Sequence, residues 1–262
     1  MTEQPTPGTF CWHDLACDNV DAATDFYSAL LGWTREDDPK VEDVYARLFH
    51  NGAGFGGAFA RTPETMPRAA WTPYLAVESV ETAMAAAPEH GGAVMFGPID
   101  LPGENRGRIA YLQTPSGTPV GIFEAGPEGE GAPPQPGRHA FTWYELNTRK
   151  KDEDLAFFDG LFDWSFNHKS IGPAAGYVEF GLPDQETIGG LMPMEGEMWG
   201  ELPSHWMLYV QVDAVDDAAA RATELGGTIC VPPTDIPPVG RFSVIDDPGG
   251  ATFSIIQLSE KG

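Results

Sequence analysis

The sequence predicts an α+β fold in which four strand–helix–three-strand modules form two tandem domains. The first observation behind this prediction is an internal repeat: the stretch that begins at Phe10 returns at Phe141. Its anchor residues recur at a constant spacing of 131 positions without a gap, pairing Trp12 with Trp143, Phe26 with Phe157 and Trp33 with Trp164. One strand-then-helix unit has therefore been used twice.

The second observation is that each half of the chain is itself double. A new unit begins near Trp71, where a strand is followed by a helix that stops at Gly91-Gly92. The same order returns in the second half, with a stop at Gly226-Gly227, 135 positions later. Each half thus contains two modules of the type βαβββ.

The individual elements follow from apolar periodicity and from turn residues. In the first half, strands are expected at 10–17, 44–49, 56–60, 72–77, 94–96, 108–112 and 119–123, and helices at 20–31 and from Ser79 to about His90. In the second half, strands are expected at 141–147, 176–181, 188–192, 206–212, 229–231, 241–246 and 252–257, and helices at 152–161 and 214–225.

These elements give a domain plan with two halves of similar size. Residues 1–8 are expected to be a disordered lead-in, 9–125 the first domain, 126–138 a Pro/Gly linker and 139–258 the second domain. In each domain two modules share one strongly curved mixed sheet with the helices outside. The other face of that sheet is then a concave cup, which suits a small ligand.

The charge of the chain excludes some classes of partner. Fifteen Lys and Arg stand against 39 Asp and Glu, for a formal charge of −24. Such a surface repels nucleic acid and anionic membranes. No apolar run approaches the roughly 20 residues of a membrane span, and the N-terminus is not a signal peptide. Cys11, Cys17 and Cys230 lack metal-like pairing, and Cys11 and Cys17 are expected to be reduced core thiols, so the predicted location is the cytoplasm.

Several short motifs carry a resemblance to a known family. They are the Leu-Gly-Trp33 end of the first helix, the strand exits Val77-Glu78 and Val212-Asp213, and the turn Asp247-Pro-Gly-Gly250. The first half departs from the last motif, with Thr114-Pro-Ser-Gly117 in its place. The chain resembles the vicinal oxygen chelate superfamily, which includes lactoylglutathione lyase, bleomycin-resistance proteins and extradiol dioxygenases.

The resemblance covers about 10–125 and 140–258 and is similar in type to two-domain actinobacterial proteins labelled glyoxalase-like or hydroxylase. It implies two glyoxalase/bleomycin-resistance-like domains. It does not fix the activity, because the superfamily includes lyases, dioxygenases, epimerases and binding proteins.

The resemblance also implies where a metal ion would be held. Metal enzymes of the superfamily place His, Gln or Glu on the cup side of several strands. The corresponding places here are occupied by Trp12, Thr72, Gly121, Trp143, Met207 and Ser254. Indole, thioether and glycine do not ligate a hard divalent ion, and the two hydroxyls are weak ligands. A further place, on the strands around 45–49 and 177–181, stays unassigned. We therefore expect no metal site and no cofactor.

Strand alternation predicts what the cups contain instead. Trp12 and Asp14 share a face, and so do Trp143 and Glu145; Tyr74 is expected in the first cup and Tyr209 in the second. Each cup thus offers an indole, a carboxylate and a phenol, which suit a planar or aromatic ligand. A carboxylate beside indole is expected to have a raised pKa, making Asp14 and Glu145 the candidate acid–base groups. The alternative is that each tryptophan is a core residue and each acid bonds backbone or an arginine across the domain interface, since the pair could equally mark a symmetric interface.

Three further residues have two interpretations each. His205 shares strand alternation with Tyr209 and either faces the second cup or bonds backbone at the strand entry. Arg108 and Arg241 each follow a glycine, with Asp100 and Asp235 a few residues earlier. They either clamp an anion at the mouth of the cup or brace a loop.

The sequence therefore favours a small-molecule-binding protein that works without a metal ion, in stress, resistance or secondary metabolism. Any catalysis would be acid–base chemistry. The first alternative is a metal-dependent glyoxalase-like lyase or oxygenase. The second is a structural or interaction protein whose cups are filled by side chains. The expected partner is a small-molecule ligand rather than nucleic acid or membrane, and the expected state is a monomer or homodimer.

Overall fold

The computed structural model describes residues 4–38, 45–63, 66–103, 106–127, 137–171 and 174–259. The first half runs β1 (Phe10–Cys17), α1 (Val20–Leu31), β2 (Thr34–Asp37), β3 (Tyr45–His50), β4 (Ala53–Ala60), β5 (Ala70–Ala76), α2 (Val80–Ala86), the 3-10 helix η1 (Ala87–His90), β6 (Ala93–Asp100), β7 (Gly107–Gln113) and β8 (Pro119–Ala125). The second half runs β9 (Phe141–Thr148), α3 (Lys151–Leu161), β10 (Ser165–Ile171), β11 (Ala174–Gly181), β12 (Gly189–Pro193), the 3-10 helix η2 (Glu197–Trp199), β13 (His205–Gln211), α4 (Val215–Glu224), β14 (Thr228–Ile236), β15 (Gly240–Asp246) and β16 (Thr252–Leu258).

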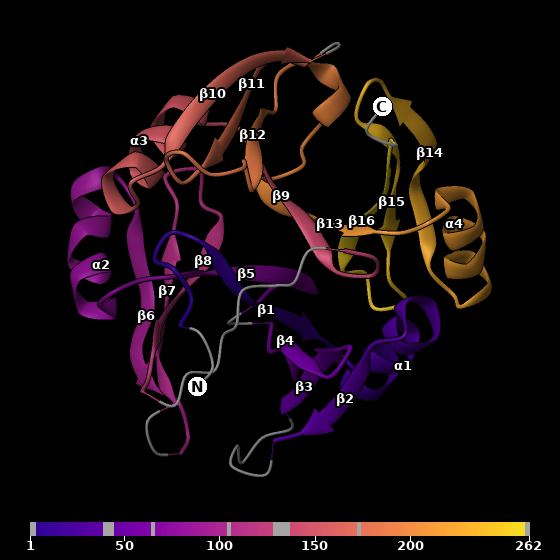
Figure 1. Ribbon diagram of the computed structural model, residues 1–262, viewed down its shortest axis with the longest axis horizontal. Coiled ribbons are helices and arrows are strands. Elements are labelled where there is room, and N and C mark those ends of the chain that lie inside the picture. Colours follow the sequence, from indigo (N-terminus) through magenta and orange to yellow (C-terminus); the bar gives the residue numbers. More distant parts are fainter. Residues whose placement is uncertain are drawn as a thin grey trace. The chain divides into compact units, whose positions relative to one another are not determined.

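The strands form two eight-stranded mixed sheets, which confirms the predicted α+β class (Figure 1). Their orders are β2-β3-β4-β1-β5-β8-β7-β6 and β10-β11-β12-β9-β13-β16-β15-β14, so the second repeats the first strand for strand. The pairs β1–β4, β5–β8, β9–β12 and β13–β16 are parallel, and the pairs within each β2–β4 or β6–β8 run are antiparallel.

Two strands were missed in the sequence, and each completes a βαβββ module. β2 pairs with β3 and β10 with β11, both at the end of a sheet order. The β2 sequence, Thr-Arg-Glu-Asp, has no apolar alternation and is largely exposed. An edge strand of this kind is defined by backbone hydrogen bonds to its neighbour, which the local sequence does not reveal.

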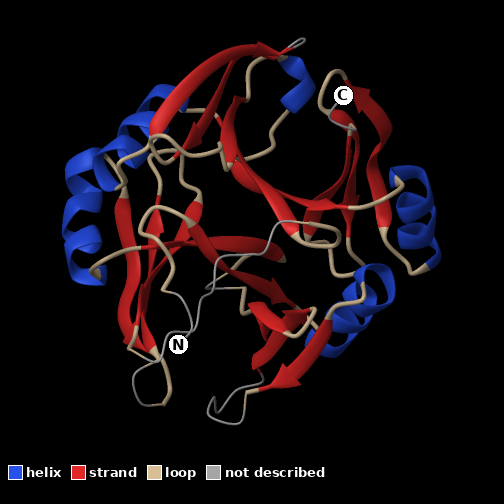
Figure 2. Cartoon of the chain, viewed as in Figure 1, coloured by secondary structure: helices blue, strands red, loops and turns tan. Residues whose placement is uncertain are grey.

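The chain separates into two compact units, and each unit combines one module from each half. Unit 1 contains residues 1–12, 72–133 and 143–207, and unit 2 contains 13–71, 134–142 and 208–262. Within unit 1, α2 packs beside α3, and within unit 2, α1 packs beside α4 (Figure 1). The helices lie along one side of the strands of their modules, as Figure 2 shows.

The core of unit 1 is built from stacked aromatic rings. Phe10 stacks on Tyr144 with ring centroids 3.8 Å apart, and Trp164 stacks on Phe180 at 4.3 Å. The Trp164 Nε1–H donates to the Gly8 carbonyl at 2.8 Å. Residues from both halves of the chain therefore share this core.

Unit 2 repeats the arrangement around the matching tryptophan. Trp33 stacks on Tyr27 at 5.3 Å, and its Nε1–H donates to the His139 carbonyl at 2.7 Å. Tyr27 also packs against Phe253 of β16. Trp33 and Trp164, which mark the sequence repeat, thus each bond a backbone carbonyl of the opposite half.

His13 is a core residue of unit 2. Its side chain is fully buried and packs on Phe141 with ring centroids 4.5 Å apart. His13 Nδ1 lies 2.7 Å from the Phe55 carbonyl oxygen, so Nδ1 carries the proton and donates it. Burial lowers the pKa of His13 from 6.5 to about 4, which keeps the ring neutral at pH 7.

This burial predicts an acid-sensitive contribution to stability. The unfolded chain binds a proton at His13 below pH 6.5, but the folded chain does so only near pH 4. Stability is therefore lost as the pH falls between these values, by about 2 kcal/mol from pH 7 to pH 5. Urea unfolding at both pH values should show a drop that is smaller by this amount in His13→Gln. The drop should be unchanged in the exposed control His168→Gln; equal drops in all three proteins would contradict the prediction.

The closing turns of the two halves use carboxylates from different places. In unit 2, Asp247 Oδ1 accepts hydrogen bonds from the Gly249 and Ala251 amides, and Oδ2 accepts one from the Tyr27 hydroxyl at 3.1 Å. In unit 1 the equivalent of Asp247 is Thr114. There the Ser116 amide donates instead to Asp154 Oδ1 of α3, at 3.0 Å.

Part of the predicted lead-in contacts the rest of the chain. The Gly8 amide donates to the Ala76 carbonyl, and Pro5 is buried. Residues 1–3 and most of the predicted linker, 128–136, lie outside the described residues. Among the described residues, no helix is long and apolar enough to cross a membrane.

Candidate functional site

The clearest polar site lies on β9 and β11, within unit 1. Thr148 of β9 donates to Asp154 of α3, so the alternate residues Trp143, Glu145 and Asn147 lie on the face turned away from that helix. The Trp143 Nε1–H donates to the Tyr177 hydroxyl oxygen at 2.9 Å. The Tyr177 hydroxyl is hydrogen-bonded in turn to the Glu145 carboxylate. We call this face the second-half site.

Electrostatics keep Tyr177 in its neutral, donating form. Burial and the neighbouring Glu145 carboxylate raise the pKa of Tyr177 well above its usual value. Two positions further along β11, the carboxylate of Glu179 is almost buried and forms an ion pair with Lys169 Nζ at 2.6 Å. Two carboxylates, one phenol and one ammonium group therefore belong to one small area of this sheet.

A glycine on β12 allows the tyrosine to lie across the sheet. Gly190 pairs with both Glu145 and Glu179 in register. A Cβ at Gly190 would stand 2.1 Å from the Tyr177 hydroxyl oxygen, so any side chain there would displace the ring. The phenol thus occupies the space that a side chain at this position would fill.

Next along β9, Asn147 meets His205, the first residue of β13. His205 Nδ1 lies 2.9 Å from the Pro203 carbonyl, so Nδ1 is protonated and Nε2 is an acceptor. Asn147 Nδ2 lies 3.5 Å from that Nε2. Burial lowers the pKa of His205. His205 thus makes the backbone bond at the strand entry that was one of its two interpretations, and it also borders the second-half site through Asn147.

The first half has a matching pair in unit 2. The Tyr45 hydroxyl donates to Asp14 Oδ1 at 2.7 Å, and Asp14 is only 7% exposed. A Cβ at Gly57 would stand 2.2 Å from the Tyr45 ring, as at Gly190 in the second half. The residue two positions after Tyr45 is Arg47, whose guanidinium lies 5.2 Å from the centroid of the Phe49 ring. We call this face the first-half site.

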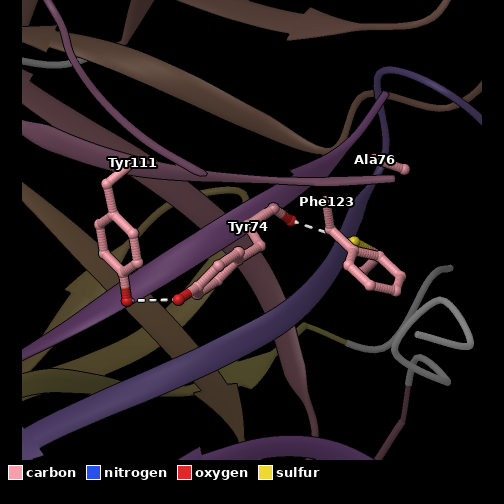
Figure 3. Close-up of a cluster of buried hydrophobic side chains, with 5 residues drawn as sticks. Tyr74, Ala76, Tyr111 and Phe123 are labelled. Carbon is pink, nitrogen blue, oxygen red and sulfur yellow. Dashed lines mark hydrogen bonds between the residues drawn. The ribbon is translucent and has the colours of Figure 1, made fainter. Parts of the chain in front are cut away.

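Trp12 and Tyr74 meet in a hydrophobic cluster of unit 1. Tyr74 is 1% exposed and packs with Cys11, Tyr111 and Phe123, with Trp12 against the cluster. Figure 3 shows the Tyr74 and Tyr111 hydroxyls pointing toward one another, and they are hydrogen-bonded. The Tyr74 hydroxyl is thus hydrogen-bonded within the protein, which favours a core role for Tyr74. Its ligand-binding role stays a prediction.

The other predicted ligand-binding residues have partners in the chain. The Tyr209 ring lies 6.4 Å from that of Phe242 in unit 2. Arg108 forms ion pairs with Asp100 and Glu81, and Arg241 with Asp235 and Asp216. Because two carboxylates engage each guanidinium, this geometry favours the braced loop over the anion clamp.

Tyr45 and Tyr177, the two residues that the candidate acids bond, were not among the predicted site residues. They lie in the strands whose place could not be assigned, and the β3 and β11 registers now align Tyr45 with Tyr177 and Arg47 with Glu179. A signal was present: both tyrosines follow their acid by 31 or 32 residues and precede a charged residue by two. The spacing to the helix differs between halves, which hid the match.

Comparison with known proteins places the fold and the family. Residues 12–123 match a family described as "Glyoxalase-like domain", and residues 126–255 match "Glyoxalase/Bleomycin resistance protein/Dioxygenase superfamily". The protein "Putative glyoxylase CFP32" of Mycobacterium tuberculosis is 34% identical over 257 residues, covering 95% of each chain. The chain belongs to the glyoxalase/bleomycin resistance protein/dioxygenase superfamily, also called the vicinal oxygen chelate superfamily.

Two further proteins are similar to this chain. The "Anthracycline biosynthesis protein DauV" of Streptomyces sp. strain C5 is 29% identical, covering 97% of this chain and 94% of its own. The structure of the Mn(II)-bound glyoxalase from Novosphingobium aromaticivorans aligns with a TM-score of 0.65 at 16% identity. It covers 96% of this chain and 82% of that one, so it supports the fold alone.

The residues at the superfamily's metal-ligand places do not fit a divalent ion here. Gly121 has no side chain, and a Cβ there would stand 2.3 Å from the Tyr74 ring. The buried Ser254 hydroxyl donates to the Ser243 carbonyl at 3.0 Å. Across the described part of the chain, no group of three or more His, Cys, Asp or Glu side chains is placed to hold a metal ion.

Proposed function

We propose that this superfamily member binds a small, partly aromatic or dicarbonyl-like molecule without a metal ion. The observation that carries the proposal is the repeated acid–tyrosine pair, Asp14 with Tyr45 and Glu145 with Tyr177, each laid across a glycine. Buried polar side chains are costly to maintain, and keeping the same pair in both halves points to use in binding.

The chemistry of the second-half site supports an aromatic ligand. Trp143 is partly exposed and supplies apolar area, while its N–H fixes the Tyr177 hydroxyl. The hydroxyl hydrogen-bonded to Glu145 provides a defined polar group beside that area. The curated relative named for anthracycline biosynthesis agrees with this class, since anthracyclines are planar aromatic molecules.

Acid–base catalysis forms part of the proposal, with Glu145 and Asp14 as the proton-transferring groups. Each carboxylate lies next to a phenol that stays neutral or donates, so a proton on a bound ligand would have an acceptor within the site. We propose that the protein acts in stress, resistance or secondary metabolism and is located in the cytoplasm.

The test is a fluorescence titration with planar aromatic and dicarbonyl molecules in the presence of a strong metal chelator. Saturable quenching of the tryptophans is expected. Trp143→Ala should remove most of the second-half signal. Tyr177→Phe should weaken binding about tenfold, because the ligand loses one hydrogen-bonding partner. Tyr45→Phe is the matched variant, and it reports on the first-half site alone.

Two results would overturn the proposal. One is stoichiometric zinc, nickel, iron or manganese in the purified protein by elemental analysis, with binding abolished by the chelator. The other is the absence of any quenching across the panel. Native mass spectrometry of the purified protein would name any molecule that co-purifies.

A further inference from the structure

We infer that the second-half site takes a ligand with a protonated amine beside its aromatic part. The inference rests on the proposed function and adds the charge and hydrogen-bonding character of the ligand. It begins with the two nearly buried carboxylates, Glu145 at 8% and Glu179 at 9% exposure. Both pair in register with Gly190, so they flank it at about one strand spacing, 4.8 Å, on either side.

A second and independent observation is an orphaned acceptor on the same face. Asn147 is 2% exposed, and its Oδ1 has no hydrogen-bond partner among the described residues. The amide cannot be turned to satisfy it without losing the contact, because His205 Nε2 is an acceptor and needs the NH2 group. A buried acceptor without a partner calls for an N–H or O–H from a ligand.

The acceptors outnumber the donors at this site. Glu145, Glu179 and Asn147 Oδ1 all accept. The donors already have partners: Lys169 is ion-paired with Glu179, Trp143 donates to the Tyr177 oxygen, and the Tyr177 hydroxyl is bonded to Glu145. An ammonium group brings three donors and a positive charge, which match this lining. The indole of Trp143 adds attraction for a cation near its face.

The first-half site lacks this character, and one position accounts for the difference. Arg47 occupies on β3 the place that Glu179 occupies on β11, since each pairs with the glycine under its tyrosine, Gly57 or Gly190. A guanidinium there repels an amine. The repeat thus keeps the acid–tyrosine pair and reverses the neighbouring charge, which makes this position the determinant of ligand charge.

The test uses three naphthalene probes that differ only in their polar group: naphthylethylamine, naphthylethanol and naphthylacetate. Their binding is measured by calorimetry at pH 7 in about 0.15 M salt, where long-range attraction by the acidic surface is largely screened. The wild-type protein should bind the amine at least about tenfold more tightly than the alcohol.

Four variants locate the effect. Glu145→Gln and Glu179→Gln should each remove most of the preference for the amine, and Glu179→Arg, which copies Arg47, should shift it toward naphthylacetate. Asn147→Leu should weaken amine binding about threefold, because the amine loses an acceptor. It should not lower the unfolding midpoint, because the change removes a buried polar atom that has no partner. Glu153→Gln, an exposed change in α3 with the same loss of charge, should leave the preference intact.

The outcomes separate this inference from the function on which it rests. If no probe binds, both fail. If the probes bind but the alcohol matches the amine, or the folded Gln variants keep the wild-type preference, the inference is overturned and aromatic binding stands. Near-ultraviolet circular dichroism identifies any variant that has lost its fold, and the remaining acid variant then decides the question.

Discussion

Expressed separately, residues 1–125 and 139–262 are expected not to fold as stable monomers. Each compact unit contains modules from both halves, so either half alone would leave both of its cores open. The first half would lose the partner of Phe10 in unit 1 and the His139 carbonyl that Trp33 bonds in unit 2. The second half would lose the Gly8 carbonyl at Trp164 and the Tyr27 ring beside Phe253.

This prediction is checked by near-ultraviolet circular dichroism and urea unfolding of each half and of the mixture. Each half alone should lack a cooperative transition, and mixing should restore one. As a control, full-length protein with a protease site at residue 131 should stay folded and hold its pieces together after cleavage. A half that unfolds cooperatively as a monomer would contradict the prediction and support division into independent domains at the linker.

Asp247→Ala is expected to lower the free energy of unfolding by about 3 kcal/mol. The change removes the acceptor of two turn amides and the acceptor of the buried Tyr27 hydroxyl proton, while the Trp71 Nε1–H still donates to the Tyr27 oxygen. Asp247→Asn should cost less, because its amide oxygen still accepts from the two turn amides and its NH2 group can donate to the Tyr27 oxygen. Only the Tyr27 hydroxyl proton then loses its acceptor. Burial raises the pKa of Asp247, so the neutral amide also avoids the cost of a buried charge.

Chemical denaturation at pH 7 measures both changes. Asp163→Ala, an exposed aspartate between α3 and β10, is the matched control and should leave the midpoint unchanged. Asp154→Ala should repeat the large effect in unit 1, where that residue serves Ser116 and Thr148. Equal losses for Asp247→Ala and Asp247→Asn would show that charge rather than the hydrogen-bonded turn carries the stability.

Much of the fold was predictable because the repeat and the periodicity are local signals. The first strand and helix match their predicted ranges, 10–17 and 20–31, and the Asn19 side chain caps that helix through the Ala22 amide. The strands that were not predicted, β2 and β10, depend on nonlocal interactions, because they form by pairing with β3 and β11. The grouping of modules into units was equally hidden, because contacts such as Trp164 with Gly8 join residues 156 positions apart.

The site was predictable in part for the same reason. Strand alternation identified Glu145 and Asp14, and the structure finds each hydrogen-bonded within a polar cluster. It did not identify Tyr45 or Tyr177, since those contacts depend on the register of β3 and β11. Arg108 and Arg241 form ion pairs with carboxylates of α2 and α4, which no pattern within their own strands would reveal.

The two closing turns show that the halves of this duplicated chain are no longer interchangeable parts. Ser116 relies on a carboxylate from α3, whereas Asp247 carries its own and meets Tyr27 of α1. A chain made of two first halves would have Ala23 at the place of Asp154, and the Ser116 amide would then lack an acceptor. A chain made of two second halves would bring Asp154 and Asp247 to one buried turn and set like charges against each other. After duplication the two halves have diverged, so that each half now needs the particular residues of the other.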